Sequence, residues 1–388
     1  MKTMPTSAPP GKSPRGIKIV PCRTRPELRR FENAAEDILG AAPQFVPPLP
    51  GSVVETFLPG SPFLVAHGEL QAFLALRGGR PVGRIAAILN RSHNDYHRDR
   101  TGFFGFFDFA EDETAAELFG AAVGWLGARG CDLGRGPYSP SVNDTCGLLT
   151  HGFDDAPAVF MPWNPPRYVE TYRSLGLHPV RTLYSFDIRL NVPADPTIAK
   201  LADRTRRRSG LDTRAFRLDD IEAELRILQR LYNVTLDRNW GYVPVKWEDL
   251  EHSARGLKTI ADPGMIYFVT HGGREVGYSI SLPDINDFLL RSRRWPRGFL
   301  RLLPMLWMIK TRKPRRARHL ILGIEPEFRH TVGIAPLLYH ETFGRVGACG
   351  YDWGEISWIE ANNEQIVRGI EMLGGTKGET YTLWEKPL

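Results

Sequence analysis

The chain has 388 residues, of which 42% are hydrophobic and 24% are charged, and its formal net charge is +6. These values are ordinary for a globular protein that is long enough for about two domains. The N-terminus lacks the apolar stretch of a secretory signal, so we expect residues 1–15 to form a disordered tail and the protein to be cytoplasmic. Four scattered cysteines without a C-x-x-C pair argue against a disulfide scaffold or a zinc site.

The first half of the chain predicts a hairpin, a third strand and a helix. Two runs rich in β-forming residues, Leu70–Arg77 and Val82–Leu89, flank a Gly-Gly turn. Gly102–Asp108 predicts the third strand. Apolar residues at helical spacing predict a helix over residues 114–129, which Gly130 ends.

A polar stretch after the hairpin carries candidate functional groups. Residues 91–100 are so polar that we predict a loop. His97 and Asp108 are candidates for catalytic proton transfer, because a histidine or carboxylate with a pKa near neutrality accepts a proton readily. His93 and Asn94 are candidate substrate contacts. No further metal ligand is identifiable near His93 and His97, so we predict no metal; the alternative is that these residues only hydrogen-bond the loop.

The second half repeats the order of the first. Tyr267–Thr270 and Val276–Leu282 flank a second Gly-Gly turn, and a helix ending at Gly350 corresponds to the one ending at Gly130. We therefore predict an α/β (α+β) fold of two lobes in tandem, each with a mixed, mostly antiparallel sheet flanked by helices. The predicted segments are a tail (1–15), an N-terminal lobe (16–190), a linker (191–212) and a C-terminal lobe (213–388).

A basic and aromatic segment lies in the second half. Arg291–Arg318 holds eleven Lys or Arg residues and no acidic residue, and its centre, residues 298–309, is apolar. This pattern suits peripheral contact with a membrane interface, here the inner membrane. The apolar run is too short to span a bilayer. A core helix with a solvated basic rim is the alternative, and nucleic acid is not expected as a partner because no recognition module accompanies the charge.

A strand, a loop and a helix follow between Ile321 and Val346. A helix that begins directly after such a loop presents unpaired N–H groups and a positive dipole end, which together hold a phosphate. We predict a pyrophosphate site from the residues of this loop and its flanks: Ile324, Arg329, His330, Gly333, Ile334 and Ala335. A plain α/β turn is the alternative. The first lobe has the acidic segment Phe109–Glu113 at this place, where carboxylates repel pyrophosphate.

Further polar groups stand at strand ends or inside strands. Glu355 lies in an otherwise apolar strand, where a carboxylate is either salt-bridged or a base with a perturbed pKa. Asp284 and Asn286 stand at the end of a strand, and Asn143 lies in a segment rich in turn residues whose polarity could line a pocket; all three are candidate substrate contacts. Asn and Asp turns explain these three positions equally well.

The C-terminal order of strand, loop, helix and strand resembles the GNAT superfamily of acyl-CoA-dependent N-acyltransferases. In that superfamily the loop holds the coenzyme A pyrophosphate, and an Asn region, here Asn362, lies beside the pantetheine arm. The loop departs from the usual Arg/Gln-x-x-Gly-x-Gly/Ala pattern. His330 stands where Arg or Gln is usual, and Arg329 is one residue early.

From about residue 45 to 388 the chain resembles the bacterial tandem-GNAT set that includes bacterial ceramide synthases. The motifs that carry this resemblance are residues 82–88, 102–108, 135–137, 143, 152–153, 283–286 and 357–362. The resemblance implies transfer of a fatty acyl group from acyl-CoA or acyl carrier protein to a primary amine, with a sphingoid base or other long-chain amine as acceptor. His97, Asp108 or Glu355 would deprotonate the amine. The alternatives are acetyl transfer to a soluble amine, an aminoacyl-tRNA-dependent transferase and a non-catalytic coenzyme sensor.

Overall fold

The computed structural model describes residues 16–191, 196–252 and 261–388. The predicted tail, residues 1–15, lies outside the described residues. Among the described helices, none has the length and apolar content that crossing a membrane requires.

The first half of the chain forms a series of strands with helices between them. Its elements are β1 (Ile17–Cys22), α1 (Arg25–Leu39), α2 (Ser52–Thr56), α3 (Pro62–Ala66), β2 (Gly68–Arg77), β3 (Arg80–Asn90), α4 (Arg91–His97), β4 (Thr101–Phe109), α5 (Asp112–Gly127), β5 (Leu133–Gly136), β6 (Tyr138–Ser139), β7 (Thr145–Cys146), β8 (Leu148–His151), α6 (Arg167–Ser174) and β9 (His178–Arg189).

The second half repeats this alternation and has two helices between its third and fourth strands. Its elements are α7 (Pro196–Ser209), β10 (Leu211–Ala215), η1 (Leu218–Asp220), α8 (Ile221–Thr235), η2 (Pro263–Met265), β11 (Ile266–His271), β12 (Arg274–Pro283), α10 (Asn286–Ser292), α11 (Phe299–Thr311), β13 (Arg316–Ile324), η3 (Pro326–Phe328), α12 (Ile334–Ala348), β14 (Trp353–Glu360), α13 (Glu364–Met372) and β15 (Thr376–Pro387).

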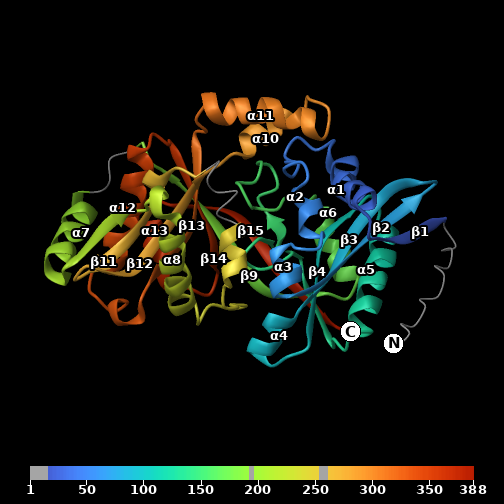
Figure 1. Cartoon of the computed structure of the whole chain (residues 1–388), viewed down its shortest axis with the longest axis horizontal. Coiled ribbons are helices and arrows are strands. Elements are labelled where there is room, and N and C mark those ends of the chain that lie inside the picture. Colours follow the sequence, from blue (N-terminus) through green and yellow to red (C-terminus); the bar gives the residue numbers. More distant parts are fainter. Residues whose placement is uncertain (1–15, 192–195, 253–260) are drawn as a thin grey trace.

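One sheet runs through the whole molecule (Figure 1). Its 13 strands follow the order β1-β2-β3-β4-β5-β15-β9-β14-β13-β12-β11-β10, with β8 paired to β15 off this path. Among the described strands, β4 with β5 and β13 with β14 pair in parallel, and the other pairings of this sheet are antiparallel. The predicted fold class, a mixed and mostly antiparallel α/β fold, is confirmed.

The two halves exchange strands at the centre of the sheet. β9 comes from the first half but pairs with β14, and β15 comes from the end of the chain but pairs with β5 of the first half. The two lobes therefore share one sheet. The predicted boundaries implied that the lobes separate at one position in the chain, whereas the strand exchange joins them. Residues 196–209 of the predicted linker form α7, whose buried Ala202 and Thr205 face the second half.

Each half contains a place where two parallel strands separate. In the second half, β13 and β14 pair from Arg316 opposite Trp353 to His319 opposite Ile356. Within the described residues, the two strands do not pair after His319 and Ile356. In the first half the corresponding space is occupied by the chain itself. The Phe106 N–H donates to Ser139 Oγ at 3.1 Å, and a Cβ on Gly105 would lie 1.3 Å from the Tyr138 carbonyl oxygen.

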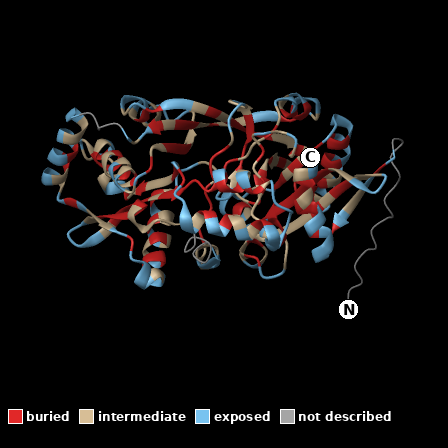
Figure 2. Cartoon of the chain, turned by 90° about the horizontal axis from the view of Figure 1, so that it is seen from above, coloured by how far each residue is buried: buried red, intermediate tan, exposed pale blue. Residues whose placement is uncertain are grey.

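Helices cover both faces of the sheet, and buried residues follow its strands while exposed ones follow the outer helix faces (Figure 2). α5 packs its apolar side on the first half of the sheet, and α12 does so on the second half through Leu337, Leu338 and Val346. α12 thereby brings its N-terminal end to the carboxyl end of β13. The predicted coenzyme loop connects these two elements.

Candidate active site

The loop between β13 and α12 depends on a glycine at its end. Gly333 is the N-cap residue of α12 with a φ of 83°, in the left-handed region. A Cβ at this position would lie 2.2 Å from the Thr205 hydroxyl oxygen on α7, so side chains are excluded by space as well as by backbone conformation. The close approach of α7 therefore fixes the entry of α12.

This helix start has the features of an anion site. Within the described part of the chain, the N–H groups of Val332 and Gly333 form no hydrogen bond. The first turn of α12 carries no acidic residue. Free N–H groups at a helix N-terminus, combined with the positive end of the helix dipole, favour a phosphate. The Ile334 N–H donates to the Thr331 carbonyl at 3.0 Å, and a phosphate contact of Gly333, Ile334 and Ala335 stays a prediction.

The two cationic residues of the loop are placed differently from each other. Arg329 donates from Nε to the Ile324 carbonyl at 3.2 Å and from Nη2 to the Thr235 carbonyl at 2.8 Å, so it ties the end of β13 to the end of α8. His330 is exposed. Contact of either residue with a phosphate stays a prediction.

Asn362 lies in the exposed turn that follows β14. The neighbouring Asn363 is the N-cap of α13 and accepts a hydrogen bond from Ile366 N at 3.3 Å. A role for Asn362 beside the pantetheine arm also stays a prediction.

Glu355 is a buried carboxylate in β14, close to the point where β13 and β14 separate. It is 2% exposed, and its Oε1 accepts a hydrogen bond of 2.7 Å from the Ser357 hydroxyl. Arg318 of β13 donates from Nε to the same hydroxyl oxygen at 2.9 Å. Burial raises the pKa of Glu355 to about 7, although nearby Arg318 and Arg316 oppose the rise. A carboxylate with this pKa can accept a proton near neutral pH.

Two further carboxylates lie near Glu355. Asp187 of β9 is its cross-strand neighbour, and burial, followed by the charge of Glu379, raises the pKa of Asp187 to about 6. Glu379 hydrogen-bonds to the Ser185 hydroxyl. Like charges close together disfavour joint ionisation, so Glu355 and Asp187 retain protons at a pH at which exposed carboxylates are fully ionised.

A loop from the first half of the chain covers this cluster. Val159 donates its N–H to Asp284 Oδ1 at 2.9 Å and accepts at its carbonyl from Arg318 Nη1 at 2.7 Å. Asn286 Nδ2 donates to the Pro157 carbonyl at 2.8 Å. Asp284 and Asn286, predicted as substrate contacts, thus hold the covering loop in place.

The first-half candidates lie apart from this cluster. Residues 91–97, predicted to be a loop, form the helix α4, because the Asn90 side chain caps it by accepting from His93 N at 2.9 Å. His97 Nε2 lies 2.8 Å from the Tyr242 carbonyl, an acceptor that requires the ring nitrogen to carry the proton. Asp108 accepts from Arg84 Nε at 2.7 Å. Both side chains therefore have structural partners.

Of the remaining predicted contacts, His93 and Asn94 lie on α4, and Asn143 joins the first half to α8. Burial, and after it the charge of His97, lowers the pKa of the buried His93 to about 4. Asn94 is partly buried on the same helix. Asn143 accepts a 2.5 Å hydrogen bond from the Tyr232 hydroxyl of α8. Among the described residues, no group of three or more His, Cys, Asp or Glu could hold a metal ion.

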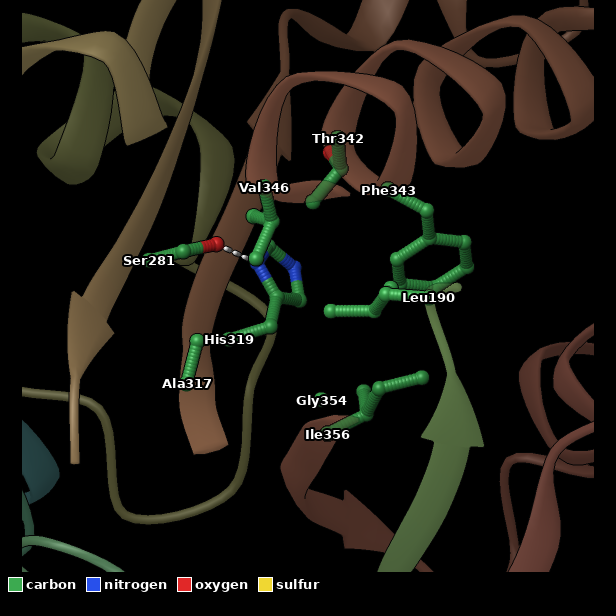
Figure 3. Close-up of a pocket in the computed structure, with 9 residues that line it drawn as sticks. All are labelled: Leu190, Ser281, Ala317, His319, Thr342, Phe343, Val346, Gly354 and Ile356. Carbon is green, nitrogen blue, oxygen red and sulfur yellow. Dashed lines mark hydrogen bonds between the residues drawn. The ribbon is translucent and has the colours of Figure 1, made fainter. Parts of the chain in front are cut away.

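A small cavity lies under α12, on the face of β13 and β14 opposite to the face that carries Glu355 (Figure 3). His319 and Ser281 hydrogen-bond at 3.1 Å on its wall, and burial lowers the pKa of His319 to about 4. The cavity measures about 10 Å³, close to the least that holds one water molecule. It is too small for an acyl chain and is separate from Glu355.

Comparisons with known proteins agree with this geometry. No family model matches the chain. It is 29% identical over 385 residues to the bacterial ceramide synthase of Caulobacter vibrioides (strain NA1000 / CB15N), covering 96% of this chain and 98% of the relative. It is also 29% identical over 375 residues to the protein YghO of Escherichia coli (strain K12), covering 93% of each.

Solved structures with the same fold include a tandem GNAT protein from the clavulanic acid biosynthesis pathway, with a TM-score of 0.56, 13% identity and coverage of 96% of this chain and 98% of that one. A GCN5-related N-acetyltransferase from Sphaerobacter thermophilus gives 0.52 and 13%, with 95% of each chain covered. These two solved structures share the overall fold of this chain. The chain therefore has the tandem GNAT fold, is similar over nearly its full length to the bacterial ceramide synthase and to YghO, and is an acyltransferase.

Proposed function

We propose that this enzyme transfers a fatty acyl group from acyl-CoA to the primary amine of a sphingoid base or another long-chain amine, at the cytoplasmic surface of the inner membrane. Similarity over nearly the full length to a protein named bacterial ceramide synthase supports this choice of acceptor. The observation that carries the proposed chemistry is the buried Glu355, whose pKa of about 7 suits proton transfer near neutral pH.

The donor would bind in the second half of the chain. Its pyrophosphate would lie at the free N–H groups of Val332 and Gly333, and its acyl end would point toward the separation of β13 and β14. A backbone N–H exposed there would stabilise the oxyanion of the tetrahedral intermediate. The space filled by Tyr138 and Ser139 in the first half argues against a second donor site.

In the proposed reaction the neutral amine attacks the thioester carbonyl carbon. A C–N bond forms, the C–S bond breaks, and the coenzyme A thiolate leaves. The amine loses one proton, which Glu355 accepts directly or through a water molecule and then passes to the thiolate or to solvent. Arg318 and Ser357 orient the Glu355 carboxylate through their shared hydrogen bonds. No covalent enzyme intermediate is needed.

A kinetic comparison tests this proposal. Purified protein is supplied with a long-chain acyl-CoA and a sphingoid base, and the amide is quantified by mass spectrometry. We expect Glu355→Gln to lower kcat/KM by about 100- to 10,000-fold, the usual contribution of a general base. Glu371→Gln, at an exposed position of α13, should retain full activity.

Three other outcomes would redirect the assignment. Acetylation of a soluble amine without any lipid amide would indicate a small-molecule acetyltransferase. Copurifying tRNA with salt-sensitive binding would indicate an aminoacyl-tRNA-dependent enzyme. Coenzyme binding without turnover on any amine would indicate a sensor.

A further inference from the structure

α11 presents an apolar face to solvent. Five of its side chains are exposed by between 40% and 71%: Phe299, Leu300, Leu303, Leu306 and Trp307. At about 100° per residue, these positions cover about one third of the helix circumference. We call them the α11 stripe. Large apolar side chains clustered on one helix face mark a contact surface, whereas isolated ones do not.

The opposite side of α11 is firmly attached to the molecule. Met305 and Met308 pack with Val159, Ile285 and residues of α10 in one apolar cluster. The buried Arg301 donates to both carboxylate oxygens of Glu36 on α1, at 2.8 and 3.0 Å. α11 is therefore a fixed helix with one apolar side packed inside and a second apolar side turned outward, and Figure 1 shows it at the outer edge of the molecule.

Cations surround the α11 stripe. Arg294, Lys310 and Arg312 are exposed, and no carboxylate within the described part of the chain pairs with them. The Arg312 guanidinium lies 5.6 Å from the centroid of the Trp307 ring. Apolar and aromatic side chains bordered by unpaired cations are complementary to a bilayer interface with anionic headgroups.

We propose that the α11 stripe and its three bordering cations are a docking surface for an anionic phospholipid membrane. The inference deepens the proposed function and rests on it for its purpose, the collection of a lipid amine. The stripe would enter the boundary of the acyl chains, and Arg294, Lys310 and Arg312 would contact lipid phosphates. A second copy of this chain could cover an apolar face equally well, but the three like charges at its border would repel their equivalents.

The position of α11 connects this surface to the candidate reaction site. Its inner face packs on Val159, the residue whose main chain is bound by Asp284 and Arg318 above Glu355. One helix diameter, about 10 Å, therefore separates the proposed membrane surface from the loop that covers the carboxylate cluster. A long-chain amine leaving the bilayer at α11 meets this covering loop first.

Vesicle flotation with the full chain tests the inference. The probes are vesicles of phosphatidylcholine alone and vesicles of phosphatidylcholine mixed with phosphatidylglycerol. We expect the wild type to float with the mixed vesicles, and the double variant Leu303→Glu/Trp307→Glu to bind at least about tenfold more weakly. Replacing Arg294, Lys310 and Arg312 with Gln should weaken binding by about 100-fold, about fivefold for each cation. Met372→Glu, at an exposed apolar residue of α13, should bind as the wild type does.

Two results would overturn the inference. One is wild-type flotation that is absent or is unchanged in the double variant. The other is a wild-type dimer that becomes monomeric in the double variant without vesicle binding, which would identify the stripe as a protein interface. Turnover of a water-soluble amine, measured without vesicles, separates failure of the docking proposal from failure of the proposed function. If only docking is lost, this turnover remains intact. Vesicle binding without any amide product contradicts the proposed function alone.

Discussion

The raised pKa of Glu355 has a measurable effect on stability. In the folded protein the Glu355 carboxyl group has a pKa of about 7, compared with the ordinary value of 4.5. The associated stabilisation is complete below the ordinary pKa and is lost as the pH rises through the folded pKa, because ionisation of the buried carboxylate is costly. At about 1.4 kcal/mol for each pH unit, the loss above about pH 8 is about 3 kcal/mol.

Glu355→Gln removes this titration while keeping nearly the same shape, and its amide oxygen can still accept from Ser357. Urea unfolding of both proteins across pH measures the difference in the free energy of unfolding, in which the titration of other groups largely cancels. The variant should gain about 2 to 3 kcal/mol relative to the wild type between about pH 5 and pH 8. Glu371→Gln should show no such change. If the pH dependences of Glu355→Gln and the wild type run parallel, Glu355 has an ordinary pKa and the argument for a neutral-pH base fails.

Three further predictions follow from the same geometry. Gly333→Ala should weaken coenzyme A binding at least about tenfold by calorimetry, because its Cβ would collide with α7, whereas Gly344→Ala, whose Cβ would have open space, should bind normally. The kcat/KM of the wild type should rise with pH through about 7 as Glu355 ionises, and this limb of the profile should be missing in the residual activity of Glu355→Gln. Arg318→Met should cost about 3 to 5 kcal/mol in urea unfolding because it leaves buried carboxylates and the covering loop without their partner, whereas Arg315→Met, at an exposed ion pair, should cost about 1 kcal/mol or less.

Local patterns predicted the elements well where neighbours in sequence determine them. The two Gly-Gly hairpins became β2–β3 and β11–β12, because alternation and turn residues specify adjacent strands. The exchange of β9 and β15 between the halves was not predicted. Alternation shows which face of a strand is buried, but the pairing partner depends on contacts far along the chain.

The residues of the candidate site were likewise predicted only in part. Glu355 could be identified from sequence because a carboxylate in an apolar strand is either salt-bridged or a base with a perturbed pKa. Arg318 and Ser357 were not predicted, since their contact depends on the register of β13 against β14 and on a loop from the other half. The spacing of two residues between Glu355 and Ser357 could have indicated that both side chains lie on the same face of a strand. His97 was placed in a loop because the capping of α4 by Asn90 was overlooked.

A competition experiment tests the central claim most directly. The purified enzyme is given one long-chain acyl-CoA, anionic vesicles carrying a sphingoid base, and an equal amount of a soluble primary amine, and all amides are measured by mass spectrometry. The account predicts that the lipid amide dominates and that its formation falls together with kcat/KM in Glu355→Gln. Amide formation on the soluble amine alone, or a lipid amide formed equally well by Glu355→Gln, would contradict it.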